Sequence, residues 1–188
     1  VTGYRKTITV TAALLIIDVQ YDTTLVSVNA TSNQSTQQIV DPVLTGLTFE
    51  INGTEVSAGV AVKVPTGSAL TIVSPDITNY AKTVTAAATA EGVSYMATVA
   101  YTTPLVTLNM VSDVAGVETS APTGARGTVS YSGGTDQTIA NGEFAKVPTG
   151  TQFTVTYVAV TNYGTPTGYS GTASGTSMTA TKAAYVQG

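Results

Sequence analysis

Apolar and polar residues alternate along many short stretches of this chain. Leu25 to Asn29 reads Leu-Val-Ser-Val-Asn, and Leu105 to Asn109 reads Leu-Val-Thr-Leu-Asn. Such alternation is typical of a β-strand with one buried face. No window shows a sustained apolar stripe at helical spacing, and the most helix-prone stretch, 86–90, is interrupted by Thr and stopped by Gly92. The pattern therefore predicts an all-β protein with little or no helix.

Short strands separated by turn residues are expected throughout two consecutive segments, a pattern typical of a β-sandwich. Asn52-Gly53 and Asn141-Gly142 are strong hairpin signals, because both residue types tolerate positive φ. The breaks at Glu91-Gly92 and Ser174-Gly175 also predict hairpin turns. The expected strands are 25–31, 47–52, 60–64, 69–74, 82–89 and 93–101, then 105–111, 127–132, 143–147, 152–160, 169–174 and 177–184.

The two segments are copies of one repeat of about eighty residues. The stretch that begins at Leu25 recurs 80 residues later, and Val64-Pro65-Thr66-Gly67 recurs 83 residues later as Val147-Pro148-Thr149-Gly150. Tyr101, which closes the first copy, aligns with Tyr185 after 84 residues. The extra residues therefore fall in loops, and tandem Ig-like β-sandwich repeats are predicted.

Residues 1–24 match the second half of the same repeat. Thr2 to Thr7 aligns with Thr78 to Thr83, and Tyr21 aligns with Tyr101. We therefore predict three parts, which are the C-terminal half of a preceding repeat (1–24), one complete repeat (25–103) and a second (104–188).

The first of these parts is apolar but lacks the strands that would cover it. Exposed apolar area costs about 25 cal/mol per Å² relative to burial, so a cover is expected. It is either the first half of that repeat, upstream in a longer chain, or strands of a neighbouring subunit added by β-augmentation. The apolar residues concerned are Ile8, Val10, Leu14, Leu15, Ile16, Ile17 and Val19.

The composition argues against several kinds of partner. Charged residues make up 10% of the chain, and seven basic residues with a net charge of −4 do not suit phosphate binding. We therefore expect no nucleic-acid partner. The longest apolar run, Ala12 to Ile17, is too short to cross a membrane, and no membrane insertion is expected. The absence of cysteine rules out disulfides and thiolate chemistry.

The residue types of most hydrolase mechanisms are missing, because the chain has neither histidine nor cysteine. Two carboxylates suffice for a glycosidase, and Glu50 and Glu55 flank a turn. A solvated hairpin is the favoured interpretation of that pair. We predict that the protein is not an enzyme and has no catalytic residues.

Two other carboxylate pairs are candidates for Ca²⁺ ligands. Asp18 and Asp22 lie on either side of Tyr21, and Asp113 and Glu118 fall in one loop. Calcium takes six to eight oxygen ligands, so two carboxylates per loop are too few. We predict no metal site, no cofactor-binding residues and no cofactor.

Tyrosine and lysine recur at fixed places in the repeat. Tyr4, Tyr80 and Tyr163 follow Gly or Asn, where they would either stack on sugars or pack with the hydroxyl bonded to a loop, and packing is favoured. Lys63 and Lys146 precede Val-Pro, where an isopeptide bond is conceivable and a strand-edge lysine that blocks aggregation is favoured.

The order of a strand, Val-Pro-Thr-Gly, an alternating strand such as Leu70-Thr71-Ile72-Val73, and Asn-Tyr or Gly-Tyr resembles PEGA-like and carboxypeptidase-regulatory-like repeats. It also resembles, more loosely, bacterial Ig-like repeats. The resemblance covers nearly the whole chain and implies a β-sandwich. It further implies a setting on bacterial surface proteins or bacteriophage virions, where such modules act as spacers, decorations or adhesins.

These observations together predict a non-catalytic structural or adhesive module in an extracellular or virion fibre, stalk or decoration protein. Its expected partners are neighbouring repeats of a longer chain or other protein subunits. The alternative is a carbohydrate-binding module of a secreted polysaccharide-active protein, whose partners would be surface glycans. An exposed planar row of aromatic rings would favour that alternative, whereas buried tyrosines would disfavour it.

Overall fold

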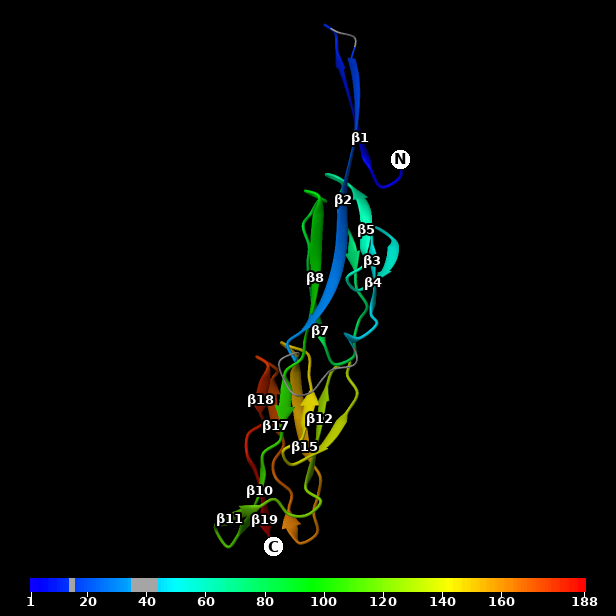
Figure 1. The fold of residues 1–188 in the computed structure, drawn as a ribbon. Helices are drawn as coiled ribbons and strands as arrows, with labels where there is room; N and C mark the ends of the chain where they lie inside the picture. Colours follow the sequence, from blue (N-terminus) through cyan, green and yellow to red (C-terminus); the bar gives the residue numbers. More distant parts are fainter. Residues whose placement is uncertain (14–15, 35–43) are drawn as a thin grey trace. The chain divides into compact units, whose positions relative to one another are not determined.

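A computed structural model describes residues 1–13, 16–34 and 44–188 (Figure 1). The described residues form nineteen β-strands and no α-helix, which confirms the predicted all-β class. Of the residues expected to need a cover, Leu14 and Leu15 lie outside the described ranges.

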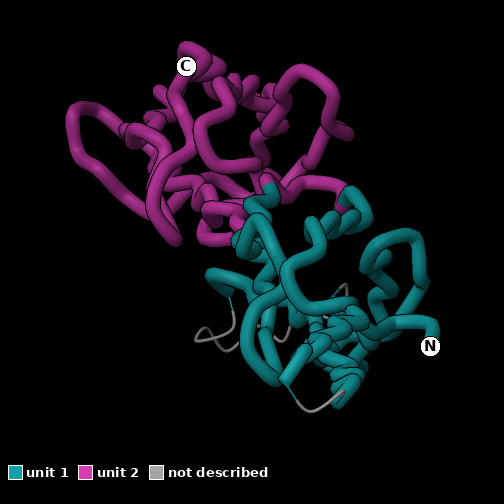
Figure 2. Tube along the Cα trace, turned by 90° about the horizontal axis from the view of Figure 1, so that it is seen from above, with its two compact units in different colours: residues 1–76, 82–101 teal, residues 77–81, 102–188 magenta. Residues whose placement is uncertain are grey.

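The chain divides into two compact units (Figure 2). Unit 1 contains residues 1–76 and 82–101, and unit 2 contains residues 77–81 and 102–188. The short segment 77–81, which follows the strands of the first repeat in sequence, thus belongs to the same unit as the second repeat. Each unit is described by itself below.

Unit 1 is built from two sheets. The larger has the order β1-β2-β8-β7, with β5 also paired to β2, and the smaller has the order β4-β3-β6. Val26, Val28, Phe49, Ile51 and Val99 are almost completely buried. The strands are β1 Arg5–Thr11, β2 Ile16–Ser32, β3 Thr48–Ile51, β4 Thr54–Ser57, β5 Ala61–Pro65, β6 Ile72–Val73, β7 Ala81–Thr85 and β8 Ser94–Thr102.

Unit 2 is built from three sheets with the orders β11-β10-β19-β16, β13-β12-β15-β17 and β14-β9-β18. Their inward side chains, among them Leu108, Val129, Phe153 and Tyr185, form one buried cluster. The strands are β9 Leu105–Thr107, β10 Met110–Val114, β11 Val117–Ser120, β12 Arg126–Tyr131, β13 Gln137–Ala140, β14 Phe144–Lys146, β15 Gln152–Tyr157, β16 Tyr163–Gly164, β17 Tyr169–Thr172, β18 Ser177–Thr179 and β19 Ala183–Gln187.

The first strand of each repeat pairs in parallel with the last. Residues Leu25 to Ser32 of β2 lie beside Ser94 to Tyr101 of β8 in one continuous ladder. In the second repeat the same ladder is split in two, with β9 beside β18 and β10 beside β19. Each repeat is thereby closed by a pair of strands from opposite ends of its sequence.

The turns agree with the sequence in part. Asn52 and Gly53 both have positive φ and join β3 to β4, as predicted. At Asn141-Gly142 only the glycine has positive φ. The predicted hairpin at Ser174-Gly175 is wrong, because β17 pairs with β15 whereas β18 pairs with β9 in another sheet. The alternation of a strand does not reveal which sheet it joins.

Several strand boundaries also differ from the prediction. The expected strand 105–111 is two strands, and the expected strand 69–74 is reduced to β6. The sequence pattern missed β4, β11, β13 and β16, which are two to four residues long. Such short strands carry too few apolar side chains to produce a detectable alternation.

Candidate assembly site

One turn occurs at three equivalent places in the chain. In each, the backbone N–H of a tyrosine donates to the carbonyl three residues earlier, namely Tyr4 to Val1, Tyr80 to Ile77 and Tyr163 to Val160. The residue before each tyrosine is Gly3, Asn79 or Asn162, and all three have φ between 68° and 78°. Glycine and asparagine are the residues that tolerate this conformation. The repeat therefore fixes a tyrosine at the end of a tight turn.

Two of these tyrosines bind the lysine that precedes Val-Pro. In unit 1, Lys63 Nζ donates to Tyr4 Oη at 2.9 Å and lies 5.1 Å from the centre of the Tyr4 ring. In unit 2, Lys146 Nζ donates to Tyr80 Oη at 3.3 Å and lies 5.3 Å from that ring. Both contacts join a turn from one sequence repeat to the lysine strand of the following repeat, and an exposed cation–π contact is worth about 0.5–1 kcal/mol.

A threonine beside each pair makes a matching hydrogen bond. Thr23 Oγ1 donates to the carbonyl of Val64 at 3.1 Å, and the equivalent Thr103 Oγ1 donates to the carbonyl of Val147 at 3.4 Å. Thr23 also donates to the carbonyl of Gly3, inside the first turn. The contact between turn and strand is thus reproduced from one repeat to the next.

The tyrosines that close the repeats are structural anchors. Tyr101 and Tyr185 are fully buried. Tyr101 Oη donates to the carbonyl of Pro75 at 2.8 Å, and Tyr185 Oη donates to the carbonyl of Val158 at the same distance. Burial raises the pKa of both phenols above the usual value near 10.

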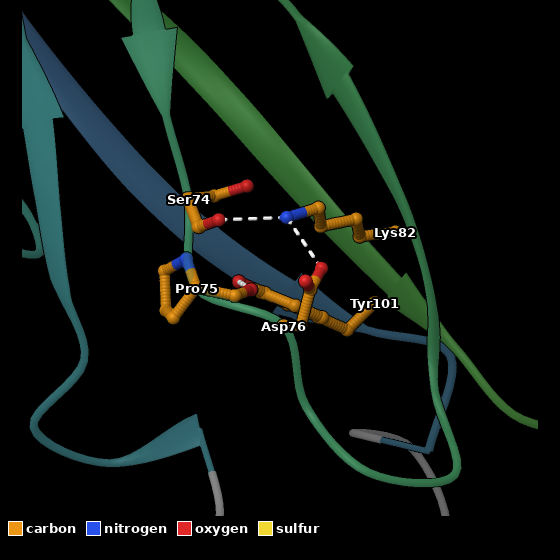
Figure 3. A network of polar contacts seen from close by, with 5 residues as sticks. All are labelled: Ser74, Pro75, Asp76, Lys82 and Tyr101. Carbon is orange, nitrogen blue, oxygen red and sulfur yellow. Dashed lines mark hydrogen bonds and ion pairs between the residues drawn. The ribbon is translucent and has the colours of Figure 1, made fainter. Parts of the chain in front are cut away.

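Lys82 lies beside the first of these anchors (Figure 3). Its Nζ donates to the carbonyl of Ser74 at 2.7 Å and forms an ion pair with Asp76 Oδ1 at 2.7 Å. The lysine and Tyr101 therefore hold the same short segment, from Ser74 to Asp76, in place. The sequence analysis missed this network, because nothing in the residue pattern marks Ser74-Pro75-Asp76 as a partner.

The hairpin of β1 and the first half of β2 has one apolar face and one polar face. Its antiparallel register places Ile8 opposite Val19, Val10 opposite Ile17 and Lys6 opposite Tyr21. Directly opposed residues share a face. We call Ile8, Val10, Ile17, Val19 and Tyr21 the hairpin apolar face. The other face carries Arg5, Thr7, Thr9, Thr11, Ile16, Asp18, Gln20 and Asp22.

The hairpin apolar face is open to solvent. Its five side chains are between 44% and 66% exposed. In the first repeat the residues equivalent to Ile17, Val19 and Tyr21 are Ala97, Val99 and Tyr101, and these are completely buried. Figure 1 shows β1 as the blue strand beside β2. The same repeat position is therefore covered in one copy and uncovered in the other.

The candidate carboxylates do not form a site. Glu50 and Glu55 face each other across β3 and β4, both exposed, which fits the solvated hairpin. Asp22 accepts a hydrogen bond from Gln20, and Asp113 accepts one from the backbone of Gly116.

Glu118, the partner suggested for Asp113, forms an ion pair with Lys182. Among the described residues no three acidic side chains lie together as metal ligands. No described helix is both long and apolar enough to span a bilayer.

The tyrosine rings do not form an exposed row. Four are buried, namely Tyr80, Tyr101, Tyr157 and Tyr185. An open hollow in unit 2 is lined by hydroxyl-bearing residues together with Tyr131 and Phe153. Phe153 is buried, and the Tyr131 ring lies over Gly134 while its hydroxyl donates to Asn79 Oδ1. Neither ring is presented as a platform for a sugar.

Comparisons with known proteins give structural likeness only. No protein family model matches the chain, and no curated protein matches it. Against a double mutant of the shaft pilin SpaA from Lactobacillus rhamnosus GG, the identity is 11%, the coverage 88% of this chain and 97% of that chain, and the TM-score 0.41.

Two longer proteins are also similar. Against the pilus adhesin SpaC from Lactobacillus rhamnosus GG, in its open conformation, the identity is 12%, the coverage 98% of this chain and 34% of that one, and the TM-score 0.36. Against the Bacillus anthracis TIE protein the values are 10%, 98% and 41%, and 0.38. With TM-scores below 0.5, the inferences below are drawn from the strand pairing and contacts of this chain.

Proposed function

We propose that this chain is a non-catalytic, load-bearing module of a multi-repeat extracellular protein. Its role is to space, decorate or attach, within a fibre or stalk whose other parts are further repeats or subunits. The setting, a bacterial surface or a phage virion, is the one that the resemblance of the sequence implies. The division into parts 1–24, 25–103 and 104–188 belongs to the same proposal.

The observation that carries the proposal is the parallel pairing of first and last strands. In the first repeat this ladder runs from Leu25 opposite Ser94 to Ser32 opposite Tyr101. A pull on the two ends of the repeat draws β2 and β8 along each other in opposite directions. All hydrogen bonds of the ladder then bear the force together, because a parallel pair pulled at opposite ends is loaded in shear.

The repeated turn contacts support the same conclusion. Tyr4 with Lys63 and Tyr80 with Lys146 show one recognition contact used twice along the sequence. An array needs such a contact in each copy, whereas an enzyme or a single-ligand binder does not. Tandem repeats of this kind gain stability from interactions between nearest neighbours.

The test is single-molecule force spectroscopy with two attachment geometries. The chain has no cysteine, so introduced cysteines give unique handles. One variant carries Leu25→Cys and Thr102→Cys, which loads the ladder in shear. The matched variant carries Leu25→Cys and Ser94→Cys, two residues opposed at one end of the ladder, which opens it one bond at a time.

We expect a higher unfolding force in the shear geometry, because unfolding under load is governed by the barrier rather than by equilibrium stability. Both variants share the Leu25 substitution, so only the direction of loading differs. Equal forces in the two geometries would contradict a load-bearing role.

A further inference from the structure

The hairpin apolar face occupies a repeat position whose normal cover is known from the other two copies. In the first repeat, β8 lies between β7 and β2, so one edge carries its hairpin partner and the other edge carries the first strand of the repeat. In the stretch Ile16 to Asp22, β2 has its hairpin partner β1 on one edge. No described strand pairs with the other edge of this stretch.

The second repeat shows the cover in detail. Ala183 and Tyr185 of β19 are the counterparts of Val19 and Tyr21, and both are buried. They belong to a cluster that includes Val129, Phe153 and Val155 from the facing sheet. Along the edge, Met110 lies opposite Ala183 and Ser112 opposite Tyr185, in parallel. The cover therefore consists of the opening strand of a repeat and the strands that face it.

We propose that the hairpin apolar face, with the free edge of β2, is the docking site for the opening half of another repeat of this kind, supplied by a second polypeptide chain. The incoming strand would run parallel to β2. Its counterparts of Met110 and Ser112 would then lie opposite Val19 and Tyr21. This inference rests on the proposed function, since it specifies how modules join in an assembly.

Both opening halves within the 188 residues already close their own repeats, so the occupant comes from outside them. A parallel pair within one chain needs a crossover connection of a dozen or more residues. A strand from a second chain needs none. The exposed edge offers the backbone groups for such strand addition, and the apolar side chains select an alternating partner.

The polar face of the hairpin explains why only one side docks. Threonine, glutamine and aspartate there remain solvated, and Asp22 is bonded to Gln20 within the hairpin. Docking on the apolar face would bury Tyr21 as Tyr101 and Tyr185 are buried, with its hydroxyl directed to a backbone carbonyl of the partner.

The probe is a fluorescein-labelled peptide with the sequence of residues 103–114, the opening strand of the second repeat. Its binding to the full chain is followed by fluorescence anisotropy. The variant Ile17→Thr/Val19→Thr removes the apolar face but keeps residues that favour strands. The matched control is Ile16→Thr, the same exchange on the opposite face. Circular dichroism establishes that all three proteins are folded.

We expect saturable binding to the wild type and to Ile16→Thr, and at least a tenfold weaker affinity for the double variant. A scrambled peptide of the same composition should not bind. Equal binding by the double variant would mean that the peptide exchanges with a strand elsewhere, and would overturn the proposal.

Two further outcomes would also overturn the proposal. One is an absence of any peptide binding. The other is self-association of the wild type that the double variant loses, detected by light scattering, because a second copy of the hairpin would then be the occupant. The force measurement is independent of all these outcomes, so failure here leaves the load-bearing function to its own test.

Discussion

Buried tyrosines show how single residues anchor this fold. Tyr101 and Tyr185 each fill the core with a ring and bond a backbone carbonyl with the hydroxyl. A buried carbonyl without a donor is costly, so the phenol satisfies a group that no strand reaches. The sequence predicted packing for the repeated Tyr4, Tyr80 and Tyr163. It did not predict that Tyr4 and Tyr80 would also bind lysines.

The substitution Tyr101→Phe tests the anchor. It removes the hydrogen bond to Pro75 and leaves that carbonyl without this donor, so the free energy of unfolding should fall by about 1–2 kcal/mol. The control is Tyr21→Phe, at the equivalent but exposed position, which should change it by less than about 0.5 kcal/mol. Urea denaturation measures both. Similar losses in the two variants would show that the buried hydrogen bond is not the cause.

Glycine has two distinct uses within the strands and turns. In turns such as Asn52-Gly53 it provides positive φ, and this use was readable from the sequence. In β12, by contrast, Gly127 provides space. A Cβ there would lie 2.5 Å from Leu108 Cδ1 and 3.2 Å from Val155 Cγ1. Only the packed structure reveals this second use.

The substitution Gly127→Ala should therefore destabilise unit 2 by about 1–3 kcal/mol through overpacking. Gly164 in β16 is a matched control, because a Cβ there would meet only the carbonyl of Val186, at 3.7 Å. Gly164→Ala should be neutral or stabilising by up to about 1 kcal/mol, since alanine restricts the unfolded chain. Thermal unfolding followed by circular dichroism compares the two, and an equal response would contradict the packing argument.

At the scale of the whole molecule, stability depends on burial and hydrogen bonds far more than on charge. Only 10% of the residues are charged. The pKa is raised by burial for four phenols, those of Tyr101, Tyr131, Tyr157 and Tyr185. The folded state thus favours the neutral phenol more than the unfolded state does.

Alkaline pH should consequently destabilise the molecule. Below about pH 10 these phenols are neutral in both states, whereas above it the unfolded chain ionises first and is stabilised. The free energy of unfolding should fall from pH 10 upward, by as much as about 1.4 kcal/mol per pH unit for each such tyrosine. Urea unfolding at pH 9, 10 and 11 measures it. A constant value across this range would contradict the assignment of these phenols as buried.

The sequence by itself determined the all-β class, the repeated positions and the conformation of several turns. These follow from local alternation and from residues such as Asn52 and Gly53, whose backbone preferences act within a few residues. Tertiary structure alone decided that first and last strands pair in parallel, that Ser174-Gly175 joins two sheets, and that Lys63 and Lys146 bind turn tyrosines. Such contacts join residues roughly sixty or more positions apart. Their choice depends on which apolar faces can be buried together, and no local pattern contains that information.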